Sequence, residues 1–192
     1  MKTPIILNLE DMIIRPWRPG DESSLVKHAN NHKIWQNVRD RFPHPYTQKD
    51  AEIWVRVAGA DRHMINLAIE LEGEAVGGIG LVFKQDVYRR SAEIGYWLGE
   101  DYWNRGIATK AVKALTTYIF QHELFDIRRI YAGIFEYNTA SGRVLEKAGY
   151  RLEARLRKSV TKNSKTVDEL VYAILKEEFV DKAQAARLLS EK

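Results

Sequence analysis

Seven short segments of the chain have the composition or the alternating apolar and polar positions that are typical of β-strands. Polar or glycine-containing segments separate them, such as the turn Glu72-Gly73-Glu74. The predicted strands cover residues 12–15, 65–71, 75–83, 91–98, 129–135, 152–156 and 167–175.

Helix end signals and apolar residues at helical spacing predict four helices between these strands. Asp21 is placed to cap the first helix, which runs through Ala29, and the sequence Thr47-x-x-Asp50 resembles a capping box for the second. The third begins near residue 107. Asn138 is a candidate cap for the fourth, and Gly149 follows its end.

The remaining segments complete a single predicted domain of residues 1–192, with its core in residues 12–175. Residues 31–46 are aromatic and predicted to be irregular, and the tail of residues 179–192 is rich in alanine and weakly amphipathic. The resulting element order is β-α-α-β-β-β-α-β-α-β-β. We found no repeat or linker that would divide the chain.

Composition narrows the classes of function. The chain has 192 residues, a net charge of +4 and no cysteine, which excludes disulfides, thiolate metal sites and cysteine nucleophiles. The start MKTPIILNLEDM does not resemble a signal peptide, and no apolar stretch approaches the roughly 18 residues of a membrane span. We therefore expect a cytoplasmic protein with no membrane partner and no metal.

The segment from Trp103 to Thr109 is the strongest candidate for chemistry. It follows a strand, contains Gly106 and opens directly into a helix. The unpaired N–H groups of such a helix start, together with the positive end of its dipole, favour an anion. Arg105 adds a positive charge, so the segment predicts a site for phosphate or pyrophosphate.

The same residues carry a family resemblance. The segment Trp103–Ala108 resembles the Q/R-x-x-G-x-G/A loop of the GNAT N-acetyltransferases, and NTASGRVLEKAGY resembles a later segment of that family. Within the family, GYWLGEDYWNRGIAT resembles the branch that acetylates the N-termini of ribosomal proteins, at alanine or serine. The resemblance implies a mixed α/β fold, with a twisted sheet of about seven strands and helices on both faces. It also implies acetyl-CoA as the acetyl donor.

The resemblance assigns roles to individual residues. It implies that two neighbouring parallel strands separate to admit the pantetheine arm. The implied cofactor-binding residues are Tyr96, Trp97, Leu98, Asn104, Arg105, Gly106, Ile107, Ala108, Thr109, Asn138 and Ser141. The aromatic region before the second helix implies an acceptor wall of Trp35, Phe42, His44 and Tyr46.

Two residues are candidates for proton transfer. Glu93 is the candidate base, with Glu136 and Asp168 in reserve, although a strand glutamate in a salt bridge is nearly as ordinary a reading. Ser141 is the candidate donor to the leaving sulfur, or else a solvated helix serine. Asn138 serves as a cap, a cofactor contact or both. Leu145 occupies the position where many GNAT enzymes have a tyrosine acid, which leaves Ser141 or a water for that role.

The acceptor stays open between several amines. An α-amine, with a pKa of roughly 7.7–8.0, costs only about 1 kcal/mol to deprotonate near pH 7, whereas a lysine costs on the order of 4–5 kcal/mol. The lack of an unmistakable base therefore favours a protein N-terminus. The alternatives are a polyamine, antibiotic or amino-acid acceptor, and a non-catalytic acyl-CoA-binding protein.

Other partners receive weaker support from the sequence. The basic residues between positions 151 and 165 are read as a solvated face rather than an RNA surface, so we expect no nucleic-acid partner. Homodimers are common among the family the chain resembles, and this leaves a homodimer open here.

Overall fold

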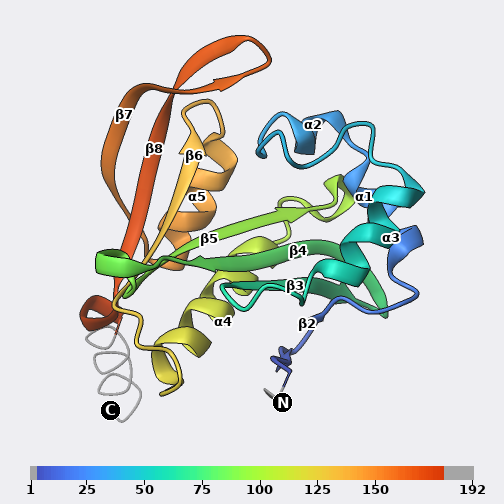
Figure 1. Ribbon diagram of the computed structural model, residues 1–192, viewed down its shortest axis with the longest axis horizontal. Helices are drawn as coiled ribbons and strands as arrows, with labels where there is room; N and C mark the ends of the chain where they lie inside the picture. The colour runs from blue at the N-terminus through green and yellow to red at the C-terminus, as the bar shows by residue number, and fades with distance from the viewer. Residues whose placement is uncertain (1–3, 180–192) are drawn as a thin grey trace.

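The computed structural model describes residues 4–179, which form one eight-stranded mixed sheet (Figure 1). The spatial order is β1-β2-β3-β4-β5-β6-β8-β7, and β5 and β6 are the parallel pair among otherwise antiparallel neighbours. The strands are β1 (Leu7–Asn8), β2 (Ile13–Pro16), β3 (Met64–Leu71), β4 (Glu74–Phe83), β5 (Ser91–Leu98), β6 (Arg129–Phe135), β7 (Arg151–Lys162) and β8 (Lys165–Leu175).

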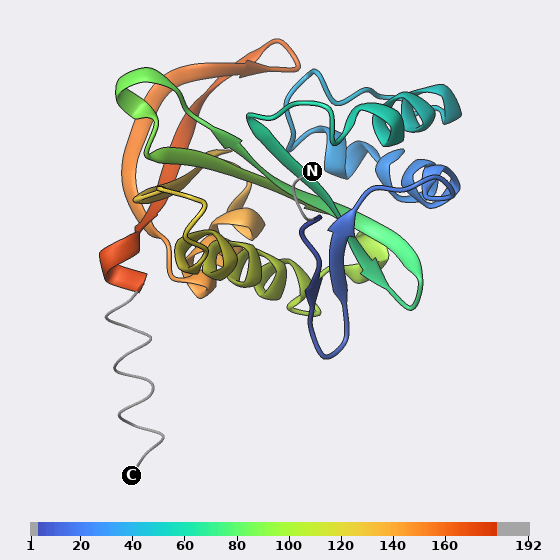
Figure 2. The ribbon, with the colours of Figure 1, turned by 60° about the horizontal axis from the view of Figure 1, so that its bottom comes forward.

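Helices cover both faces of the sheet, as Figure 2 shows, which confirms the expected mixed α/β fold. One face carries α1 (Glu22–Ala29), α2 (His32–Trp35) and α3 (Gln48–Val57). The other carries α4 (Ile107–Gln121) and α5 (Thr139–Ala148). Two 3-10 turns, η1 (Asp86–Tyr88) and η2 (Glu100–Tyr102), flank β5.

The core follows from the apolar spacing of α4. Ala111, Leu115 and Ile119 recur every four residues and are all 0% exposed against the sheet. Burying a side chain of the size of Leu115 contributes about 1.5–3 kcal/mol. A second, smaller cluster lies under α1 and α3 on the opposite face. These two clusters hold β5 and α4 in place, and with them the segment that joins the two.

The structure confirms two of the predicted helix ends and contradicts a third. Thr47 and Asp50 form the expected capping box, and Gly149 ends α5 with a φ of +97°. The prediction that the Asp21 side chain caps α1 is wrong. Its carboxylate instead accepts hydrogen bonds from the buried guanidinium of Arg15, at 2.7 and 2.8 Å. An unpaired buried guanidinium would cost more free energy than a cap contributes, so the ion pair takes the carboxylate.

Three boundaries differ from the sequence prediction. The two-residue strand β1 was missed, because it exists only through its pairing with Ile13 and Ile14. The segment of residues 31–46 contains α2, a single turn too short to show a helical period. The strand β7 extends to Lys162, well beyond the predicted 152–156, because it pairs along the whole of β8. The predicted amphipathic tail lies outside the described residues, apart from its first one.

Candidate active site

The parallel strands β5 and β6 separate along their length. They are paired only at Ser91–Arg129, Ala92–Ile130 and Glu93–Tyr131. Both continue beyond these pairs, β5 to Leu98 and β6 to Phe135. The backbone groups of the diverging segments therefore face a gap between the strands instead of each other. The gap can accept an extended chain that offers its own hydrogen-bond donors and acceptors.

An open helix start follows β5, after the short turn η2. Gly106 precedes α4 with a φ of +77°, a conformation that favours glycine, and it offers no side chain to cap the helix. Its carbonyl accepts the hydrogen bond of Lys110 N at 3.0 Å. The N–H groups of residues 107–109 precede that bond and point out of the helix.

The surroundings of this helix start fit an anion. A Cβ built on Gly106 would meet no atom within 4 Å, and Arg105 is exposed beside it. Trp103 ties the loop to the end of β5 by donating from Nε1 to the carbonyl of Leu98 at 2.7 Å. Free donors, a helix dipole and a guanidinium around open space suit a pyrophosphate.

Tyr96 and Ser141 join the diverging part of β5 to α5. The Tyr96 hydroxyl lies 2.7 Å from Ser141 Oγ and donates to the Ser141 carbonyl at 3.2 Å. Burial raises the pKa of Tyr96 well above its ordinary value of 10, so the hydroxyl stays protonated at neutral pH. Ser141 is therefore a hydrogen-bonded, partly buried residue rather than a solvated helix serine, and the Tyr96 hydroxyl holds its side chain in place.

Two neighbours on α5 have structural roles. Asn138 caps the helix, accepting a hydrogen bond from Ser141 N at 3.2 Å. Leu145 is fully buried in the main core cluster. The tyrosine that many GNAT enzymes have at that position is thus replaced here by a packing residue. From the sequence, Tyr96 was expected only to contact the cofactor through its backbone. Its hydroxyl supplies a protonated group close to Ser141 on α5.

Glu93 is held by cations. Its carboxylate is bonded by the guanidinium of Arg39 and by Lys84 Nζ, the latter at 2.7 Å, and its side chain is 13% exposed. Both oxygens therefore already accept from positive groups. The sequence left open whether Glu93 is a base or a salt-bridge residue, and this geometry is that of the salt bridge.

A cleft of about 950 Å³ lies on the sheet face that carries α1–α3 and reaches into the gap between β5 and β6. Two residues of the predicted acceptor wall, Phe42 and Tyr46, line this cleft, together with Trp97. Trp35 and His44 do not line it. They stack on each other with ring centroids 5.3 Å apart. The aromatic segment therefore contributes part of the wall and part of its support.

The tip of the β7–β8 hairpin reaches the far side of this cleft. Lys162 Nζ lies 4.0 Å from the ring centroid of Trp35 and 2.7 Å from Asp40 Oδ1, and its side chain is 2% exposed. Interpreting the basic residues of this region as solvated is therefore wrong for Lys162. No local sequence signal identifies it, because its partners are more than 120 positions away.

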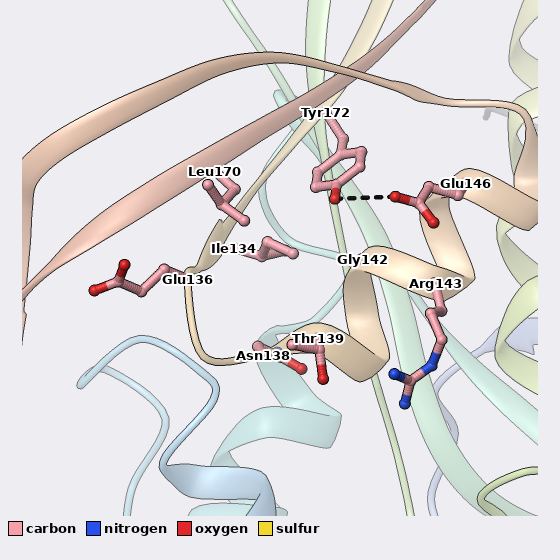
Figure 3. A pocket seen from close by; sticks show the side chains of 9 residues that line it. All are labelled: Ile134, Glu136, Asn138, Thr139, Gly142, Arg143, Glu146, Leu170 and Tyr172. Carbon is pink, nitrogen blue, oxygen red and sulfur yellow. Dashed lines mark hydrogen bonds between the residues drawn. The ribbon is translucent and has the colours of Figure 1, made fainter.

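Figure 3 shows a smaller cavity, of about 230 Å³, between the first turns of α5 and the strands β6 and β8. Tyr172 donates to Glu146 at 3.3 Å, and Arg143 lies on the same helix as Glu146. This cavity is lined by Ile134, Glu136, Asn138, Thr139, Gly142, Arg143, Glu146, Leu170 and Tyr172.

Residues 4–179 lack two kinds of feature. No group of three or more histidine, aspartate or glutamate side chains is arranged to hold a metal ion there. None of the described helices combines the length and the apolar character that crossing a membrane requires.

The acetyltransferase (GNAT) domain family matches residues 11–151 of the chain. A strand pair that opens beside a helix N-terminus is the cofactor cleft that this family implies, and the chain belongs to the GNAT acetyltransferases. It is an acetyl-CoA-dependent N-acyltransferase.

Individual relatives agree with the family. The "Uncharacterized N-acetyltransferase YnaD" of Bacillus subtilis is 27% identical over 169 residues, covering 88% of this chain and 95% of YnaD. The "Putative ribosomal N-acetyltransferase YdaF" of the same organism is 31% identical over 120 residues, or 62% of this chain and 64% of YdaF. The structure of Mycobacterium smegmatis RimJ in complex with CoA-disulfide aligns with a TM-score of 0.76 and 27% identity, covering 87% of this chain and 83% of RimJ.

Proposed function

We propose that this enzyme acetylates the N-terminal α-amine of a protein or peptide, by direct transfer while both substrates are bound. The observation that carries the proposal is the cleft of about 950 Å³ that continues into the gap between β5 and β6. Such a cleft has room for several residues of a peptide, and it leads the peptide end to the place where the strands diverge.

Two further observations support the proposal. The chain has no cysteine that could carry the acyl group, which favours direct transfer. The relatives include the "Putative ribosomal N-acetyltransferase YdaF", although the alignment covers 64% of that protein.

The acetyl donor supplies a thioester, and the residues of this chain hold and activate the reactants. The N–H groups of Ile107, Ala108 and Thr109, with the guanidinium of Arg105, would bind the pyrophosphate. The open backbone of Tyr96–Leu98 would pair with the pantetheine arm. Ser141, backed by the Tyr96 hydroxyl, would protonate the departing sulfur.

The test has two stages. Thermal denaturation is followed with acetyl-CoA, CoA, ATP or NAD, and we expect stabilisation by the first two alone. Acetylation is then measured by mass spectrometry on hexapeptides that begin with serine or alanine and contain one internal lysine. Matched peptides with a blocked N-terminus serve as controls.

We expect a single acetyl group on the free N-terminus and none on the blocked peptides. Acetylation of the internal lysine, or turnover of spermidine, kanamycin or free amino acids without any turnover of peptides, would contradict a peptide acceptor.

A further inference from the structure

One carboxylate in the cleft has no partner among residues 4–179. Four carboxylate side chains line the cleft, and three of them are bonded within residues 4–179. Asp40 pairs with Lys162, Asp61 accepts from His63 N at 2.8 Å, and Glu93 pairs with two cations. The fourth, Glu169 on β8, has no ion pair and no hydrogen bond to any described residue, although it is only half-exposed.

The position of Glu169 is set by a glycine on the neighbouring strand. Glu169 is the register partner of Phe135 on β6, and its carboxylate lies diagonally over Gly133, two residues earlier. A Cβ on Gly133 would overlap Glu169 Oε1. The missing side chain therefore lets the carboxylate cross the face of β6, on the side of the sheet that carries the cleft.

Open space lies beyond this carboxylate. Gly133 is part of β6 after its last pair with β5, so it borders the gap between the two strands. On the other border, a Cβ on Gly95 would meet nothing within 4 Å, and both glycines line the cleft. Two glycines and one unpartnered carboxylate thus surround the place where the strands diverge.

A second acceptor in the cleft also has no donor. Oδ1 of Asn37 is buried and bonds to no described atom, while its Nδ2 donates to the carbonyl of Lys33 at 2.9 Å. A buried acceptor without a donor costs free energy unless a ligand supplies one. Asn37 and Glu169 line the same cleft, and each suits a ligand that brings N–H donors.

We propose that Glu169 binds the ammonium group of the acceptor and removes its proton. This inference rests on the proposed function and deepens it by naming the group that faces the amine. The ammonium gives one proton to the carboxylate, and the freed lone pair forms the C–N bond to the acetyl carbon. The C–S bond then breaks, and its electrons and the Ser141 proton go to sulfur. The nitrogen loses its second proton as the amide forms, and that proton restores the Ser141 hydroxyl.

The other charged groups that line the cleft do not compete with Glu169 for the ammonium group. From α2 and the loop after it, Arg39, Asp40 and Arg41 line the cleft, and from β5 Glu93 does. Lys162 comes from β7 and Asp61 from the loop before β3. Within the described residues, Glu169 alone among the cleft carboxylates is free to accept from a substrate cation.

The test compares Glu169→Gln with the wild-type enzyme on the serine and alanine peptides at pH 7 and pH 9. We expect kcat/KM at pH 7 to fall by about 10²-fold, a typical contribution of an acid–base group. An α-amine is about one-tenth neutral at pH 7 and about nine-tenths neutral at pH 9. The deficit should therefore shrink several-fold at the higher pH.

A matched pair of variants controls for structural effects. Gly133→Ala keeps the carboxylate but displaces it, and should reproduce the pH-dependent deficit. If Glu169→Gln does not fold, Gly133→Ala serves as the test variant in its place. Glu72→Gln, in the exposed turn between β3 and β4, makes the same change in charge and should behave as the wild type. Calorimetry of peptide binding to the CoA complex at pH 7 should show weaker binding to Glu169→Gln than to Glu72→Gln.

Wild-type kinetics in Glu169→Gln, or a deficit of equal size at both pH values, would overturn the role of Glu169. The wild-type series tests the proposed function separately. If only small amines are acetylated, the peptide acceptor is wrong, and the same comparison of variants is then made with the best small amine.

Discussion

Replacing Gly106 by valine places a branched side chain at the first turn of α4, in a conformation that L-residues rarely adopt. The φ of +77° costs an L-residue about 1–2 kcal/mol, and a β-branched one the upper part of that range. A protein of this length loses about 2–4 °C in Tm per kcal/mol. The variant should therefore melt about 4–8 °C lower and remain folded at 25 °C.

The effect on acetyl-CoA should be much larger. The new Cβ meets no protein atom within 4 Å, so the valine side chain enters the open space that the pyrophosphate would fill. A ligand at 100 times its Kd stabilises the fold by about 2.7 kcal/mol, or about 5–11 °C in Tm for a protein of this size. We expect this shift in the wild type and its loss in Gly106→Val.

Gly73→Val is the matched control for this experiment. Gly73 has a φ of +85° and open space around it, but it lies in the β3–β4 turn and does not line the cleft. It should lose similar stability and keep the full acetyl-CoA shift. A folded Gly106→Val protein with an unchanged shift would refute the assignment of the pyrophosphate to this helix start.

Three other measurements test other parts of the structure. Ser141→Ala should lower kcat by about 10²-fold while the acetyl-CoA thermal shift persists, and a wild-type kcat would reject its role as proton donor. Lys162→Met removes the cation from Trp35 and Asp40, so trypsin should cut the β7–β8 hairpin tip faster than in the wild type, and equal rates would show that these contacts do not hold the tip in place. A hydrogen bond from Arg129 lowers the pKa of Glu153. Hydrogen bonds from Lys158 N and, to a smaller extent, from Arg155 lower the pKa of Asp168. Their folded-state pKa values lie below the unfolded ones, so their stabilising contribution is present above about pH 5 and is lost as pH falls through the folded values; a Tm unchanged from pH 7 to pH 3 would contradict this.

The sequence was sufficient wherever the cause of a structure is local. The strand Ser91–Leu98 was predicted with its observed ends, because alternation and the following turn residues both lie within it or beside it. The capping box of Thr47 and Asp50 and the end of α5 at Gly149 are equally local. The candidate pyrophosphate site was recognisable because its donors lie within seven consecutive residues.

Tertiary structure decided the chemistry of the cleft. Whether Glu93 is a free base or an ion-paired carboxylate depends on Arg39, which is 54 positions away. The exposure of Glu169 to the gap depends on the register between β6 and β8 and on Gly133 having no side chain. The burial of Lys162 depends on Asp40, 122 positions away.

The sequence by itself determined most of the elements and the family, and it indicated the candidate cofactor loop, since each depends on residues a few positions apart. The partners of the charged groups were decided only by the tertiary structure. The ionic partners of a side chain depend on strand register and on which distant segment packs against it, and a local pattern carries no record of either.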